Sequence, residues 1–278
     1  KRPTPVLALL PDSDPVSAEV HPYDGPPPEN ARERLVLVRP SSPTEFFIGT
    51  PVVFDLPDFE LDGGTIRMRA LDDLAGCAAI VEALERLVSE SVDANVYAVF
   101  TRAEEVGLFG ARLVASEEAL PRDTFVVSVE SSSVIPGVAQ GDGPVIRTGD
   151  ASYTFDAQAE HILRAADARL KEKDGGFKTQ RQLMSGGTCE ATAFAGFGYQ
   201  TTGIAFPLGN YHNATTRIPD PEGGVGAEYI KLSDFLGGVD LIVEAARGAA
   251  GLETAPGPGK LGQVADEVRA RLESTGQR

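Results

Sequence analysis

Val96-Tyr-Ala-Val-Phe100-Thr-Arg-Ala-Glu104-Glu105-Val-Gly107 joins an apolar run to two adjacent carboxylates and a glycine. The apolar run predicts a buried strand, and the helical pattern that resumes after Gly107 predicts a sharp strand-to-helix turn. Two neighbouring carboxylates at the end of a buried strand are costly unless a positive charge lies beside them. One of them could bind a cation while the other moves a proton. A solvated loop with two acids is the plainer interpretation, and the rest of the chain has to decide between the two.

Strand and helix patterns alternate from about residue 63 onward, which predicts an α/β fold. Such alternation favours a mainly parallel or mixed central sheet with helices on both faces. Sites in these folds lie beyond the carboxyl ends of the strands. The pattern predicts helices over 72–90, 107–119, 156–172 and 233–247, and strands over 96–101, 125–129, 144–147 and 201–206.

The two ends of the chain differ from this central part. Residues 1–62 are rich in proline and hold short strand-like runs separated by turns, which predicts a small and incomplete β module. Residues 63–250 form the predicted α/β domain. Residues 251–278 are predicted to be a linker followed by a charged helix over 261–273.

Composition argues against several classes of function. The formal net charge of -16 disfavours a nucleic acid or an anionic membrane as partner, because both require basic surface. The sequence contains no run of about 18 apolar residues, so it predicts no transmembrane helix. The two cysteines lack paired spacing, so we expect a reducing, cytoplasmic compartment. The chain begins at Lys1 without a secretory pattern, and we expect that its natural start has been trimmed.

Acidic and imidazole side chains recur where a site should lie in such a fold. Asp72 begins the first long helix, Glu130 ends a strand, and His212 follows another strand. Together with Glu104 and Glu105 they offer hard oxygen ligands and one imidazole, a set that suits Zn, Mn or Co. Two divalent cations roughly 3.5–4 Å apart would neutralise carboxylates that otherwise repel one another.

The chain resembles a known family at these residues. The runs Ala70-Leu-Asp72-Asp73-Leu-Ala-Gly76 and Glu104-Glu105-Val-Gly107-Leu-Phe-Gly110, followed by Gly141-Asp-Gly143-Pro144, Ser185-Gly-Gly-Thr188 and Tyr211-His212, are similar to the co-catalytic two-metal aminopeptidases of the glutamyl-aminopeptidase and tetrahedral-aminopeptidase kind. The resemblance covers residues 50–248. It implies a zinc-peptidase-like α/β/α catalytic domain, peptide substrates and a homo-oligomer. It also implies that residues 1–62 are part of an inserted module for assembly and access.

The resemblance also implies roles for single residues. Asp72 would bridge two metals, Glu105 and His212 would bind one of them, and Glu130 the other. Glu104 would be the general base that takes a proton from a hydroxide-forming water between the metals. The implied cofactors are two divalent ions, zinc first, with cobalt or manganese as alternatives. The implied function is hydrolysis of N-terminal peptide bonds.

One expected ligand is missing from the pattern. The family has a further histidine in a His-x-Asp motif upstream of the bridging aspartate, whereas this chain has only His21, His161 and His212. We expect that the missing ligand lies in an absent N-terminal segment. The alternatives are an inactive metal-binding relative and a related amidase, deacylase or carboxypeptidase. The run Thr188-Cys189-Glu190-Ala191 stands where the family usually has Thr-Asp-Ala. Glu190 could replace the family's acid in the pocket, or it could simply be the first residue of a helix.

Overall fold

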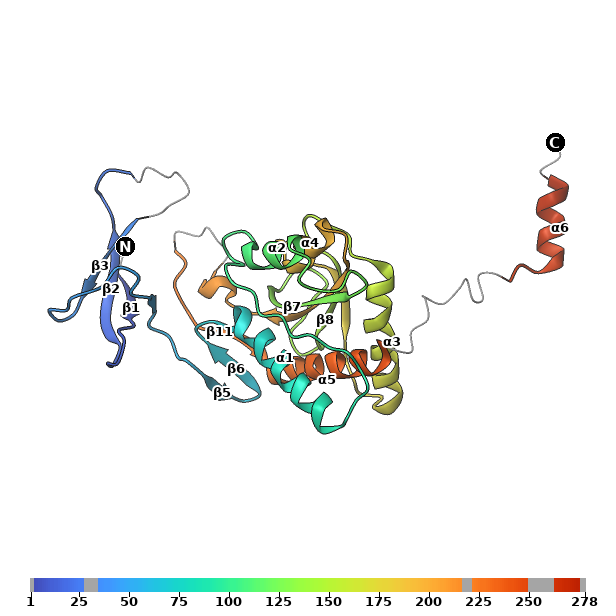
Figure 1. Cartoon of the computed structure of the whole chain (residues 1–278), viewed down its shortest axis with the longest axis horizontal. Coiled ribbons are helices and arrows are strands. Elements are labelled where there is room, and N and C mark those ends of the chain that lie inside the picture. Colours follow the sequence, from blue (N-terminus) through green and yellow to red (C-terminus); the bar gives the residue numbers. More distant parts are fainter. Residues whose placement is uncertain (1–2, 28–34, 217–221, 250–262, 276–278) are drawn as a thin grey trace.

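The computed structural model describes residues 3–27, 35–216, 222–249 and 263–275. Three sheets organise these residues: a four-stranded sheet at the N-terminus, a four-stranded central sheet and a three-stranded sheet beside it. Figure 1 shows the N-terminal sheet at the blue end of the molecule, apart from the central body. None of the described helices combines the length and the apolar character needed to cross a bilayer.

The N-terminal sheet is antiparallel with the order β3-β2-β1-β4. Its strands are β1 (Thr4–Ala8), β2 (Val16–Pro22), β3 (Val36–Pro40) and β4 (Val52–Phe54). Three of them overlap strand-like runs in the sequence, and β2 supplies the central pairing that these runs lacked. Val6, Ala8 and Ala18 are the buried residues of this small sheet, which is a thin core for an independent module.

The central sheet has the order β7-β10-β8-β9 and mixes both strand directions. Strand β10 (Gln200–Leu208) runs parallel to β7 (Phe125–Ser133) and antiparallel to β8 (Val145–Gly149). Strand β9 (Gln180–Leu183) pairs in parallel with β8. Nearly every residue of β10 is buried, because helices cover both faces of the sheet at this strand.

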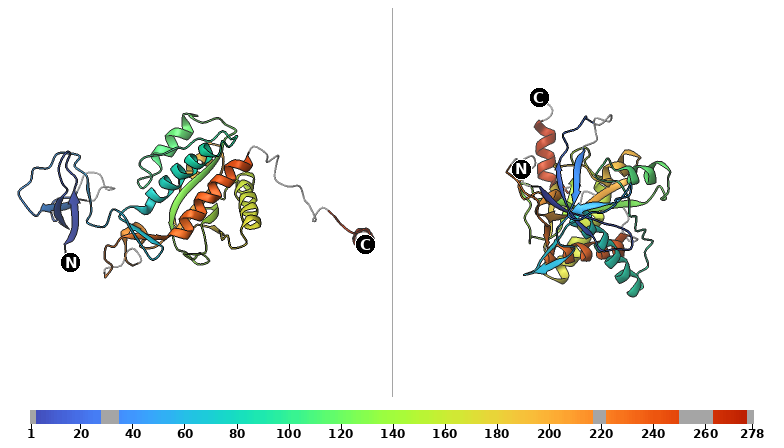
Figure 2. Two further views of the ribbon diagram at one scale, coloured as in Figure 1. Left: turned by 90° about the horizontal axis from the view of Figure 1, so that it is seen from below. Right: turned by 90° about the vertical axis from the view of Figure 1, so that its left-hand side faces the viewer.

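The helices divide between the two faces of the central sheet. Apolar clusters on one face join β10 to α1 (Leu71–Ser89), α3 (Ala157–Lys173) and α5 (Leu232–Ala249). A separate cluster packs α2 (Phe109–Ser116) against α4 (Glu190–Gly196) on the opposite face. Figures 1 and 2 show these two layers with the sheet between them. The prediction of a mixed α/β/α sandwich is therefore confirmed.

The third sheet joins two distant parts of the chain beside the start of α1. Its order is β11-β6-β5, with β5 (Glu60–Asp62), β6 (Thr65–Met68) and β11 (Glu228–Lys231) all antiparallel. Strand β5 thus pairs with the central body rather than with the N-terminal sheet. A pair of backbone hydrogen bonds between Gly209 and Tyr229, 2.9 and 3.1 Å long, fastens β11 to the loop that follows β10.

The prediction of a buried strand over 96–101 is wrong. These residues have no regular secondary structure, and the side chains of Val96, Tyr97 and Phe100 are 41, 50 and 51% exposed. A strand exists only where another strand accepts its hydrogen bonds. No described strand pairs with this segment, and β7 lies at the edge of the central sheet.

Other predicted elements match closely, with ends that move by a few residues. The helices expected over 72–90, 156–172 and 233–247 are α1, α3 and α5, and the shorter one over 107–119 is α2. The expected charged helix is α6 (Asp266–Thr275), which is exposed along its described length, while residues 261 and 262 lie outside the described part of the chain. Glu190 is the first residue of α4, as one of the two interpretations expected.

Candidate metal centre

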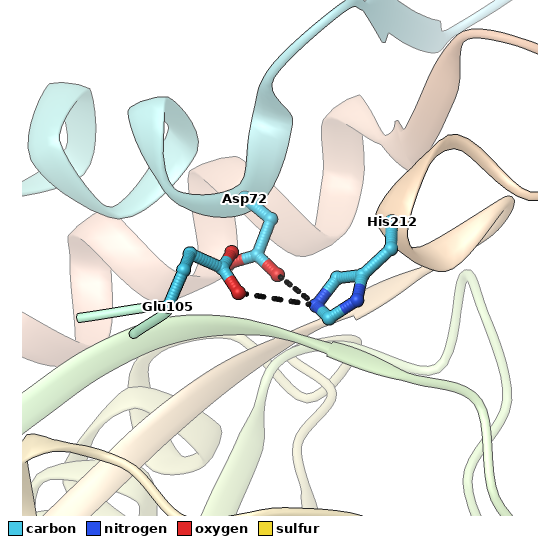
Figure 3. A group of neighbouring side chains, drawn as sticks. All are labelled: Asp72, Glu105 and His212. Carbon is cyan, nitrogen blue, oxygen red and sulfur yellow. Dashed lines mark ion pairs between the residues drawn. The ribbon is translucent and has the colours of Figure 1, made fainter. Parts of the chain in front are cut away.

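Three predicted ligands meet at one point of the structure. The Nε2 atom of His212 lies 3.4 Å from the Oε2 atom of Glu105 and 3.9 Å from the Oδ2 atom of Asp72. One ligand atom of each residue lies within 4.8 Å of the others. Figure 3 shows the three side chains converging from the start of α1, from the loop after residue 101 and from the loop after β10. Residues 140 positions apart in the sequence therefore form one cluster.

The start of α1 presents Asp72 to this cluster. Asp72 and Asp73 have non-helical backbone angles, so the regular helix begins after them. The Oδ1 atom of Asp73 accepts the N–H of Gly76 at 3.1 Å, as an N-cap does, and also accepts the hydroxyl of Ser131 at 3.0 Å. Asp73 is thereby engaged in holding the helix start, which leaves its neighbour to face the centre.

Tight loops present the other two side chains. Gly107 has a φ of 128°, and its N–H donates to the carbonyl of Glu104 at 2.9 Å, which closes the turn that carries Glu105. His212 has a backbone φ of 55°, in the left-handed region that residues other than glycine seldom adopt. The imidazole stacks on the ring of Tyr211 with centroids 3.9 Å apart.

The cluster has a strong excess of negative charge. Burial, followed by the neighbouring charges of Glu105 and Glu228, raises the pKa of Asp72 to about 8. Burial, followed by Glu190 and Glu105, raises the pKa of Glu104 to about 7. Both shifts mean that the charged carboxylates are disfavoured where they stand unless a cation joins them.

Glu130 lies in a different setting from the other predicted ligands. Its carboxylate forms an ion pair with Arg147, whose side chain is 2% exposed, and it is not in the three-residue group. The pair lines a hollow of about 300 Å³, a volume that includes the solvent at its mouth. The other lining residues include Ser132, Met184, Thr188 and Tyr211. Because Tyr211 also stacks on His212, this hollow adjoins the candidate metal centre.

The other two histidines lie elsewhere. His21 belongs to β2 of the N-terminal sheet, where its Nε2 atom lies 3.4 Å from Glu19, and His161 belongs to α3. Neither is in the group around Asp72. All three histidines of the chain fall within the described residues, so His212 is the one imidazole that the described part of the chain brings to the centre.

Sequence reasoning missed Glu228, which lies directly behind the centre. This residue of β11 is 2% exposed, and its Oε2 atom accepts the backbone N–H of Asp72 at 3.0 Å. It lies beyond the Tyr-His pair in a stretch without any helical or strand pattern long enough to place it. Glu228 stands between Ala227 and Tyr229, and a single acidic residue in this setting carried no signal that could have revealed the contact.

The donor set fits a divalent cation. Two carboxylates and an imidazole within 4.8 Å of one another are the kind of ligands that Zn, Mn and Co accept. The raised pKa of Asp72 agrees with this fit, because a cation would favour the charged carboxylate. The described residues offer this one group for a cation, while Glu130 already has a positive partner.

Comparison with known proteins places the chain among peptidases. A model of the M42 glutamyl aminopeptidase family matches residues 44–220. A protein of Acetivibrio thermocellus named "Putative aminopeptidase" is 28% identical over 192 residues, which is 68% of this chain and 53% of that protein. The chain thus spans about half the length of the curated relative that it matches.

Solved structures share the fold at low identity. The TET1 peptidase of Pyrococcus horikoshii is 22% identical with a TM-score of 0.67, covering 87% of this chain and 71% of that one. The TET aminopeptidase of Thaumarchaeota archaeon SCGC AB-539-E09 is 20% identical with a TM-score of 0.68, covering 88% and 70%. The zinc-peptidase-like architecture is therefore common to all three chains.

Proposed function

The chain belongs to the M42 glutamyl aminopeptidase family, and from this premise we propose that it acts as a metal-dependent aminopeptidase on peptides. The observation that carries the proposal is the convergence of Asp72, Glu105 and His212 from three separate elements. Structural folds alone host many activities, so the site has to support the assignment. Here the site supplies a cation-binding group, a neighbouring acid and an adjoining hollow.

The proposed cofactors are two divalent cations, with zinc first and cobalt or manganese as alternatives. Asp72, Glu105 and His212 would hold one cation, and Asp72 with Glu130 the other. Bound cations of this kind polarise a scissile carbonyl and lower the pKa of water. To serve the second cation, Glu130 would have to share its carboxylate with Arg147 or leave it.

Glu104 is the proposed general base. It opens the turn that carries Glu105, and burial with nearby carboxylates raises its pKa to about 7. A group with a pKa near the working pH takes up and returns a proton with little cost in either direction. Glu104 would therefore take a proton from the attacking water and deliver it to the leaving amine.

The hollow beside Tyr211 is the proposed position of the substrate's first side chain. Its lining mixes the Glu130–Arg147 pair with hydroxyls and the apolar Met184. While Glu130 and Arg147 remain paired, their charges offset each other, so the charge of this lining does not select an acidic or a basic side chain. A panel of peptides that differ in their first residue would measure the preference.

We also propose a homo-oligomer in the cytoplasm. The Pyrococcus horikoshii peptidase can assemble into a tetrahedron or a large octahedral shell. In this chain the N-terminal sheet stands apart from the central body, as a module for assembly would (Figure 1). Both cysteines, Cys77 and Cys189, are free thiols, which agrees with a reducing compartment. Light scattering on the purified protein would measure the number of subunits.

One observation supports a second candidate, a metal-binding relative without turnover. The described residues bring a single imidazole to the centre, and Glu130 is paired with Arg147. Such a centre would hold one cation rather than two. This candidate and the first predict different metal contents and different activities.

Metal content followed by a substrate panel tests the proposal. The protein would be loaded with Zn, Co or Mn, dialysed, and measured by elemental mass spectrometry. About two metals per chain, with cleavage of free but not acetylated peptides, would support an aminopeptidase. Cleavage of acetylated substrates instead would indicate a deacylase, an amidase or a carboxypeptidase. One metal and no cleavage would favour the inactive relative.

A further inference from the structure

Glu228 connects two of the three residues that form the candidate metal centre. Its carboxylate accepts the backbone N–H of Asp72 at 3.0 Å, and the backbone N–H groups of Leu71 and Asn213 are its other donors. Asp72 is itself a proposed ligand, and Asn213 directly follows His212. One buried carboxylate therefore holds the main chain beside both ligands.

The strand that carries Glu228 is firmly fixed. Besides its ladder with β6, β11 forms two backbone hydrogen bonds between Tyr229 and Gly209, in the loop that leads to His212. Asn213 adds side-chain bonds to the carbonyls of Arg69 and Gly226, at 2.9 and 3.2 Å. The start of α1, the end of β10 and β11 thus meet around one side chain that is 2% exposed.

We propose that Glu228 is a positioning residue that sets the spacing between Asp72 and His212, and through it the geometry of the bound cation. The proposal rests on the proposed function, because it requires that the centre binds a cation. Groups that orient metal ligands without touching the metal commonly change metal affinity by about 10- to 100-fold when they are altered. The negative charge of Glu228 behind the ligands would also favour a cation in front of them.

A purely structural carboxylate elsewhere in the fold provides a matched control. Asp234 of α5 is fully buried, and its two oxygens accept the backbone N–H groups of Gly141 and Gly143 at 2.8 and 2.9 Å. It uses the same chemistry as Glu228 but is not in the metal group. Asp234→Asn should therefore weaken the fold without altering the centre.

The test is a Co²⁺ titration of three proteins: the wild type, Glu228→Gln and Asp234→Asn. Calorimetry measures the affinity of each, and visible absorption records the cobalt spectrum. The Gln amide has one oxygen instead of two, so it cannot accept all three N–H bonds. We expect Glu228→Gln to bind Co²⁺ about 10- to 100-fold more weakly with a changed cobalt spectrum. Asp234→Asn should keep the wild-type Co²⁺ affinity and spectrum, even if its unfolding midpoint falls as far as that of Glu228→Gln.

Two results separate this proposal from the proposed function. Wild-type affinity and an unchanged spectrum in Glu228→Gln, with lowered stability, would make Glu228 purely structural and overturn the positioning role alone. Failure of the wild-type protein to bind Co²⁺ would overturn the proposed function and the positioning role together. If Glu228→Gln does not fold, Glu228→Asp keeps the charge but draws it back by one methylene. A wild-type cobalt spectrum in that variant would equally overturn the proposal.

Discussion

The two acidic parts of the site solve the same electrostatic problem in different ways. Glu130 is neutralised inside the protein by the buried guanidinium of Arg147. Among the described residues, Asp72 and Glu105 are paired with the half-exposed imidazole of His212 alone, and burial with neighbouring acids raises the pKa of Asp72 to about 8. The same type of side chain is thus satisfied by the fold in one place and left in need of a cation in the other.

This difference indicates where a bound cation would stabilise the protein most. A carboxylate with an internal partner is already stabilised, and taking it for a metal would leave Arg147 buried without its partner. A group of unneutralised carboxylates gains from any cation that reaches it. We therefore expect the cation at Asp72, Glu105 and His212 to bind more tightly than a second one near Glu130.

The largest expected effect comes from Glu104, which lies beside the acidic group of this comparison and is the proposed base rather than a proposed ligand. Glu104→Gln should lower turnover by about 10²- to 10⁴-fold, because the amide cannot accept the proton. Metal content should not change. Steady-state kinetics and elemental analysis of one preparation would measure both, with the exposed Glu85→Gln as control. Turnover at the wild-type level in Glu104→Gln would contradict the assignment of the base.

The second effect contrasts the two parts directly in metal-free protein at pH 7. Glu130→Gln should lower the free energy of unfolding by about 3 kcal/mol, because it leaves the buried Arg147 without a counter-charge. Asp72→Asn should instead leave the stability unchanged or raise it, since it removes a carboxylate that burial and its neighbours disfavour. Urea unfolding of both variants measures the sign of each change in the free energy of unfolding. Equal destabilisation of the two variants would contradict the proposed difference between Glu130 and Asp72.

The third effect is the pH dependence of the metal-free protein. Folding raises the pKa of Asp72 from 3.8 to about 8 and that of Glu104 from 4.5 to about 7, mainly through burial. The folded state therefore holds more protons than the unfolded state across this window, and the free energy of unfolding falls as the pH rises through it. Unfolding measured at pH 5.5 and 8.5 tests the sign. Asp72→Asn should flatten the slope, and a wild-type slope in that variant would rule out Asp72 as its source.

The smallest effect concerns Tyr211, which touches both parts by stacking on His212 and lining the hollow. Tyr211→Leu should weaken Co²⁺ binding by about 1 kcal/mol, or roughly fivefold, because the imidazole loses its aromatic neighbour. Tyr211→Phe keeps the ring and should bind as the wild-type protein does. Calorimetry on both variants would show whether stacking or the hydroxyl matters.

Local sequence patterns predicted much of the fold. The period of apolar residues located α1, α3 and α5, since one face of each helix has to be buried whatever lies opposite. The same reasoning failed over 96–101, where the pattern was that of a strand but no described strand supplies the hydrogen bonds. No local pattern in the sequence indicated strand β11 or the contact between Glu228 and Asp72.

The sequence by itself determined the α/β alternation and the order of an acidic set with one imidazole, and this order is what suggested the chemistry proposed for this protein. Only the tertiary structure decided which acids share a centre. Asp72 and His212 meet because β10 and α1 pack side by side, whereas Glu130 faces a guanidinium from β8. Periodicity records what each segment buries, but distances between remote side chains arise from how those segments pack.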